Sequence, residues 1–194
     1  MIPAGRPVVA VGHSFGGLWL LHERPFAWDG LVLVNGFPRF AEGDGFAPAT
    51  PRRLLDRMIA RFDAAPEAVT GDFLHRCGVE APRPEGLDAA RLGAALRALR
   101  DWDARAALVG PALALAGAQD PIVPPAMTEQ AVAGIDVGWH ADGGHLLPLT
   151  APGALRFGEA DSNDGALRIE YRYCTAQAGA CSVESVDIAL RSVR

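Results

Sequence analysis

The chain has 194 residues, of which 49% are hydrophobic and 21% charged, a composition typical of a globular protein and unlike that of a disordered one. Its net charge of −5 argues against nucleic acid as a general partner. No apolar run reaches the ~18 residues of a membrane-spanning helix, and the first residues lack the basic and apolar regions of a signal peptide. We therefore expect a cytoplasmic protein with no membrane partner.

Short runs of apolar, β-favouring residues recur along the first 150 residues. Because these runs are apolar on both faces, they are typical of strands buried in a parallel sheet. A helical pattern through Leu18 and Leu21 follows the first run. These runs place strands at 7–11, 31–34 and 112–116; a fourth strand is expected at 135–140 and a further helix at 125–133. This order predicts an α/β fold.

The stretch between the second and third expected strands, residues 37–105, shows no strong strand pattern. Helical periodicity instead covers 51–64, 66–77 and 88–103, with a break at Pro82-Arg83-Pro84. This region is therefore predicted to be a helical insertion.

The sequence pattern changes after Pro152, and residues 158–194 are predicted to be a β-rich tail unlike the parallel strands before it. Apolar and charged residues alternate from Leu167 to Tyr173 and again from Val186 to Leu190, which predicts an antiparallel β-hairpin. If these strands pair, Cys174 and Cys181 lie within bridging distance. The alternative is two unpaired thiols, which is usual in the cytosol.

A Gly12-x-Ser14-x-Gly16 pattern stands between the first strand and its helix. In that position the pattern favours a sharp turn that presents a nucleophilic serine near a helix N-terminus. The alternative is an ordinary glycine-rich turn.

A serine nucleophile needs a base, and the base needs an orienting group. Asp120 follows the third strand and His145 the fourth, so both are expected at the same edge of the sheet as Ser14. The alternatives are a turn or capping role for Asp120 and an exposed loop position for His145. Asp101 and Asp103 fit surface or capping positions better than the role of the acid.

Three segments carry a resemblance to a known family: Gly12-His13-Ser14-Phe15-Gly16-Gly17, Gly117-Ala118-Gln119-Asp120-Pro121-Ile122-Val123-Pro124 and Gly143-Gly144-His145. From about Pro7 to Leu155 the chain resembles the α/β-hydrolases, and within them the esterases that act on pimeloyl-acyl-carrier-protein methyl ester in biotin synthesis. The resemblance implies a mostly parallel core built from 1–36 and 106–157, with a helical cap at 37–105.

The same resemblance implies roles for individual residues. Ser14 would be the nucleophile, His145 the general base and acid, Asp120 its orienting group and the backbone N–H of Phe15 an oxyanion donor. No metal or organic cofactor is implied, and the three cysteines show no metal-binding spacing. The substrate would be a small acyl ester. We expect its pocket to be lined by His13, Met58, Phe62 and Phe73, although apolar helix residues are also typical of a simple core.

Arg53, Arg57 and Arg61 share one face of the first cap helix. On an acidic protein, this stripe is a candidate docking surface for an acidic acyl carrier protein. The alternative is a solvated face whose arginines pair with Asp56 and Asp63.

The expected function is a serine carboxylester hydrolase that acts through an acyl-enzyme. Only six residues precede Pro7, so the loop that usually supplies a second oxyanion donor has no counterpart here, and the first strand is expected at an exposed sheet edge. Since loss of one donor costs roughly 10²–10³ in rate, we expect this chain alone to have little esterase activity. The alternative is a truncated, non-catalytic binding module of the same fold.

Overall fold

A computed structural model describes residues 8–80, 86–151, 155–157, 166–174 and 181–189, the last three segments as backbone only. Its main sheet has four parallel strands in the order β1 (Val9–His13), β2 (Gly30–Val34), β3 (Ala112–Gly117) and β4 (Asp136–His140). The predicted α/β fold with a mostly parallel sheet is confirmed. All four strands lie within two residues of their expected positions.

The two central strands, β2 and β3, are the most buried part of the main sheet. All five residues of β2 are buried, and so are the last five of β3, because a parallel sheet with both faces covered needs apolar residues at every position. The edge strand β1 differs: Val11 is 45% exposed, and within the described part of the chain β1 pairs only with β2. The expected apolar edge is therefore present.

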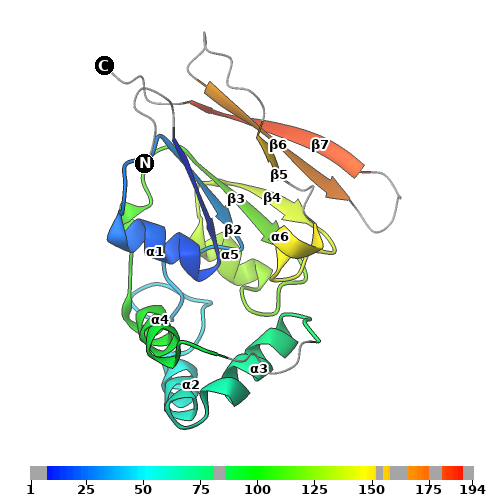
Figure 1. Ribbon diagram of the computed structural model, residues 1–194. Coiled ribbons are helices and arrows are strands. Elements are labelled where there is room, and N and C mark those ends of the chain that lie inside the picture. Colours follow the sequence, from blue (N-terminus) through cyan, green and yellow to red (C-terminus); the bar gives the residue numbers. More distant parts are fainter. Residues whose placement is uncertain (1–7, 81–85, 152–154, 158–165, 175–180, 190–194) are drawn as a thin grey trace.

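The connecting helices α1 (Phe15–Glu23) and α5 (Pro125–Ala131) lie on one side of the sheet (Figure 1). The strand order advances in one direction from β1 to β4, and right-handed crossovers then place successive helices on the same face. A single turn, α6 (Leu147–Thr150), and a 3₁₀ turn at Arg105–Ala107 complete this part.

Three helices between β2 and β3 form a separate layer beyond the carboxyl ends of the strands (Figure 1): α2 (Arg52–Ala64), α3 (Pro66–Arg76) and α4 (Ala89–Asp101). We call them the cap helices. Leu55, Ile59 and Phe62 are the buried residues of α2 and follow one another at helical spacing. The opposite face of α2 is charged, which is why this helix covers the core along one stripe only.

The tail forms a second, antiparallel sheet of β5 (Leu155–Phe157), β6 (Ala166–Cys174) and β7 (Cys181–Ala189). The predicted hairpin is confirmed in β6 and β7, and β5 adds a strand that the alternation pattern did not indicate. Cys174 and Cys181 are opposite each other in the backbone register. Their side chains lie outside the described residues, so the bridge between them stays a prediction.

Candidate active site

Ser14 occupies the turn between β1 and α1 in a conformation that non-glycine residues rarely adopt, with φ 53° and ψ −125°. Such a backbone costs on the order of 1–3 kcal/mol and persists only where its surroundings enforce it. Two hydrogen bonds do so here: the Ser14 N–H donates to the Val34 carbonyl at 3.0 Å, and the Gly17 N–H donates to the Ser14 carbonyl at 3.0 Å.

The glycines around Ser14 have unequal roles. A Cβ at Gly12 would lie 2.6 Å from the Cα of Gly17, so β1 and α1 approach each other too closely for any side chain there. A Cβ at Gly16 would meet nothing within 4 Å. The tight approach therefore involves Gly12 and Gly17, and Gly16 takes no part in it.

His145 joins the serine to the acid. Its Nε2 lies 2.9 Å from the Ser14 Oγ, and its Nδ1 lies 2.8 Å from Asp120 Oδ2. A carboxylate can only accept, so Nδ1 carries a proton and Nε2 is free to accept the serine hydroxyl proton. The rings and carboxylate are enclosed, with His145 1% and Asp120 3% exposed. The structure thus brings all three predicted residues into one hydrogen-bonded chain.

The second oxygen of Asp120 is held by the backbone. Its Oδ1 accepts hydrogen bonds from the N–H groups of Ile122 at 2.7 Å and Val123 at 2.9 Å. The turn-capping role and the role of orienting His145 are therefore filled by the same carboxylate, one oxygen each. This arrangement fixes the carboxylate plane before any substrate arrives.

The backbone N–H of Phe15 is the first of helix α1, where N–H groups have no acceptor within the helix. Among the described residues none accepts a hydrogen bond from it. Together with the positive end of the helix dipole, this leaves a donor beside Ser14 that can bind a developing negative charge. The absence of a second oxyanion donor stays a prediction.

A cavity of about 370 Å³ opens at Ser14 between the core and the cap helices. Met58 and Phe73 line it, as the sequence analysis expected, together with apolar residues of the β2–α2 loop, α4 and α5. Phe73 also meets the ring of His145 edge-on, with 6.1 Å between ring centroids. The cavity is therefore mostly apolar, opens at Ser14 and is covered by the cap helices.

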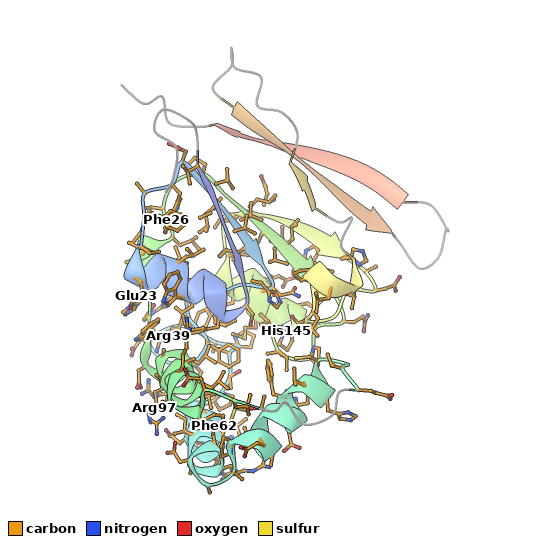
Figure 2. All side chains as sticks on the ribbon, in the orientation of Figure 1. Glu23, Phe26, Arg39, Phe62, Arg97 and His145 are labelled. Atoms are coloured by element: carbon orange, nitrogen blue, oxygen red, sulfur yellow. The ribbon has the colours of Figure 1, made fainter. Side chains whose placement is uncertain are left out.

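His13 and Phe62 are not among the residues that line this cavity, so their assignment to the pocket is wrong. Phe62 is 5% exposed and packs beside Gly93 of α4, and Figure 2 shows it deep among the cap helices. His13 lies beside His145, where its Nε2 is 2.7 Å from the carbonyl oxygen of His145.

The arginine stripe on α2 is exposed as expected, but its arginines do not pair with the carboxylates named in the sequence analysis. Arg61 forms an ion pair with Asp72 of α3 at 2.8 Å. Arg53 and Arg57 have no carboxylate within 4 Å among the described residues.

The alternative, in which the arginines of this stripe pair with Asp56 and Asp63, is wrong. These carboxylates reach across to α4, where Asp56 meets Arg100 at 3.1 Å and Asp63 meets Arg97 at 2.8 Å. Figure 2 shows Arg97 on the outer side of the cap.

Two arginines that the sequence analysis did not single out have clear places. Arg76 is the only charged residue that lines the described cavity; it donates to the Pro121 carbonyl at 3.2 Å. In the sequence, Arg76 could have been found from its spacing of three residues from Phe73, which places both on one helix face.

Arg39 is buried between core and cap (Figure 2) and pairs with Asp103. Hydrogen bonds from Arg105 and then Arg39 lower the pKa of Asp103 to about 2.

Two searches of the described residues give negative results. No group of three or more His, Cys, Asp or Glu side chains there is suited to hold a metal ion. No helix in the same part of the chain has the length and apolar character to cross a bilayer.

The fold matches solved structures of hydrolases. An esterase from Exiguobacterium antarcticum aligns at 22% identity and a TM-score of 0.61, over 73% of this chain and 61% of that one. A hydrolase from Pseudomonas aeruginosa aligns at 23% identity and 0.58, over 76% and 61%. BioG from Haemophilus influenzae aligns at 22% and 0.56, over 72% and 67%. The chain thus spans about three fifths of the first two relatives.

No curated protein matches the sequence. The model of the alpha/beta hydrolase family matches residues 2–156, which contain the sheet, the cap helices and the Ser14–His145–Asp120 chain. The protein belongs to the α/β-hydrolase family.

Proposed function

We propose that this protein is a serine carboxylester hydrolase that acts through an acyl-enzyme. The observation that carries the proposal is the hydrogen-bonded chain Ser14–His145–Asp120, which ends in a strained serine at the floor of an apolar cavity. A chain of nucleophile, base and orienting acid has no structural need to open into a cavity, whereas an acyl-transfer site requires it.

In the first half of the reaction, the Ser14 Oγ attacks the ester carbonyl carbon while its proton passes to His145 Nε2. The carbonyl oxygen becomes an oxyanion and accepts a hydrogen bond from the Phe15 N–H. The tetrahedral intermediate then collapses, the alcohol oxygen takes the proton from Nε2, and the acyl group remains on Ser14. Asp120 stabilises the imidazolium that exists between these two transfers.

In the second half, a water molecule attacks the acyl-serine carbonyl and gives its proton to His145 Nε2. Collapse of this intermediate breaks the bond to Ser14, whose oxygen recovers the proton from Nε2, and the carboxylic acid leaves. Each half therefore uses the same base in both directions, so the ring of His145 has to keep its position through both halves.

The cavity indicates the acyl part of the substrate. Apart from Arg76 its lining is mostly apolar, so it fits an alkyl chain next to the ester. Arg76 donates only to a backbone carbonyl and has no carboxylate within 4 Å among the described residues, so part of its guanidinium is available to a ligand. We propose an ester whose acyl chain carries an anionic or acidic group beyond the alkyl part.

An acyl chain attached to an acyl carrier protein has this character. The resemblance to esterases of biotin synthesis supports it, and so do Arg53 and Arg57, which are exposed on α2 beside the cavity residue Leu54. An acidic carrier docked on these arginines would be steered to the mouth of the cavity. A carrier-linked methyl ester is therefore our proposed natural substrate.

Covalent labelling tests the proposal. A fluorophosphonate probe loses fluoride to the attacking Ser14 Oγ, so the chain should gain one phosphonyl group, at Ser14, and Ser14→Ala should gain none. Hydrolysis of a short methyl ester by the same preparations measures turnover. An unlabelled Ser14 in folded protein would support the alternative, a non-catalytic binding module, and would contradict the proposed function.

A further inference from the structure

Because of the strand order, the catalytic histidine and the serine follow strands at opposite edges of the main sheet. His145 follows β4, whereas Ser14 follows β1, and β2 and β3 lie between these two strands. With neighbouring strands about 4.8 Å apart, the ends of β1 and β4 are separated by roughly 14 Å. The segment from 141 to 145 therefore has to run across the carboxyl ends of β3 and β2 before His145 can reach Ser14.

The first part of this crossing rests directly on β3. A Cβ at Gly117, the last residue of β3, would lie 2.2 Å from the carbonyl oxygen of Gly143. The Gln119 N–H donates to that same oxygen at 2.9 Å. Backbone thus lies on backbone at this point, and both glycines are needed for the crossing segment to pass.

The second part is held by Asn35, the residue after β2. Its Nδ2 donates to the carbonyl oxygens of Gly144 and His145, both at 2.9 Å, and its Oδ1 accepts from the Gly117 N–H at 2.8 Å. These partners fix the orientation of the amide, because only the NH₂ group can face two carbonyls. Asn35 is 2% exposed, so water is poorly placed to replace these bonds.

The third part is held by His13, the last residue of β1. Its Nε2 lies 2.7 Å from the His145 carbonyl oxygen, so this nitrogen carries the proton and donates. Burial lowers the pKa of His13, which favours the neutral form of the ring. With Asn35 on one side and His13 on the other, both lone pairs of the His145 carbonyl are occupied.

We propose that Asn35 and His13 are positioning residues for the catalytic His145, an inference about its role that rests on the proposed function. Neither side chain lines the substrate cavity, and each binds the backbone of His145 rather than its ring. They determine where the imidazole stands between Ser14 and Asp120. Since a misplacement of about 1 Å can lower a rate about 10²-fold, their loss should act on kcat and leave KM nearly unchanged.

Asn35→Asp is the sharpest variant. Asn35 has a φ of 45°, a conformation that aspartate tolerates, and aspartate keeps the acceptor for the Gly117 N–H. It replaces the two N–H donors by an oxygen that faces two carbonyls, and it adds a negative charge at this buried position. His13→Gln retains an N–H donor at a similar reach, whereas His13→Leu has none, so the first should restore what the second loses.

Two readouts are needed. The rate of fluorophosphonate labelling at Ser14 should fall about 10²-fold in Asn35→Asp, fall less in His13→Leu and recover in His13→Gln. The ring Nδ1–H of His145, assigned by its loss in His145→Gln, should give a slowly exchanging NMR signal in the parent chain. That signal should shift and exchange faster in Asn35→Asp and His13→Leu.

Thr128→Val is the control for general destabilisation, because Thr128 is 2% exposed on α5 and does not line the cavity. It should leave both readouts unchanged. A labelling rate within about twofold of the parent in Asn35→Asp, or an unchanged His145 signal, would overturn the positioning role. If the parent chain itself is not labelled, the proposed function fails, and the NMR signal alone still decides whether Asn35 and His13 position the ring.

Discussion

The parallel core and the cap helices are stabilised in different ways. In the core, β2 and β3 are buried almost completely, and buried polar side chains there are hydrogen-bonded, as Asp120 is to His145. In the cap, α2 buries one stripe, and ion pairs such as Arg97–Asp63 join its exposed side to α4. Exposed pairs of this kind contribute about 0–1 kcal/mol each. The core therefore determines the geometry of the candidate site, whereas substitutions on the exposed side of the cap helices should cost little stability.

The largest expected effect comes from the core. Asp120→Asn keeps the shape of the side chain but lets Nδ1 of His145 take the wrong tautomer, so kcat for ester hydrolysis should fall by about 10⁴. Hydrolysis assays with a methyl ester measure kcat for the parent chain and the variant. Asp101→Asn in the cap is the matched control, and an equal loss there would remove the contrast between the two regions.

A pair of glycine substitutions tests how tightly the core is built. Gly12→Ala would place its Cβ 2.6 Å from Gly17 and should lower the free energy of unfolding by about 2 kcal/mol or more. Gly16→Ala meets no atom within 4 Å and lies in α1, so it should be neutral or stabilise by up to about 1 kcal/mol. Urea unfolding measures the free energy of unfolding of both variants. Equal values for the two would contradict the close approach.

Selectivity should respond to the cap. With a pair of methyl esters that differ only in a terminal carboxylate, Arg76→Gln should lower kcat/KM about fivefold for the anionic ester, the effect of a partly solvated charge worth about 1 kcal/mol. The neutral ester should be unaffected. Arg91→Gln, on α4 and outside the cavity lining, is the control. A similar loss for both esters would mean that Arg76 does not recognise the charge.

The smallest effect concerns the junction of the two regions. The pKa of Asp103 is about 2 in the folded chain, below the ordinary value, so its ionised form stabilises the fold at neutral pH. That contribution, about 1 kcal/mol after solvent screening, is complete above pH ~4 and is lost as the pH falls towards 2. The stability difference between the parent chain and Asp103→Asn should therefore shrink over this range. Denaturant titrations at several pH values test this, and a constant difference would contradict it.

Much of the fold follows from local patterns. The apolar runs predicted β1, β2 and β3, and for the central strands β2 and β3 the reason is that a buried strand needs apolar residues at every position. Ser14, Asp120 and His145 were identifiable because each follows an expected strand. Phe62 was misplaced although it continues the stripe of Leu55 and Ile59, which already indicated packing against another helix.

The remaining site residues depend on distant parts of the chain. The partners of Asn35 lie 82 to 110 residues further on, so an asparagine after a buried strand carries no local sign of its contacts. Asp56 and Asp63 likewise pair with α4 instead of their own helix, a choice that only the crossing of two helices determines.

The Arg39–Asp103 pair has a consequence for how such a protein diversifies. The chain leaves the core near Pro38 and returns at Ala104, whose N–H donates to the Pro38 carbonyl at 2.9 Å, and a β-bridge joins Arg39 to Asp103. The two ends of the cap segment are thus fastened together. For the sheet, everything between them is a closed loop whose length adds little entropy cost. Insertions, deletions or whole replacements in this segment can therefore change the part of the cavity lining that the cap helices supply, while the segment stays joined to the sheet at the same two residues.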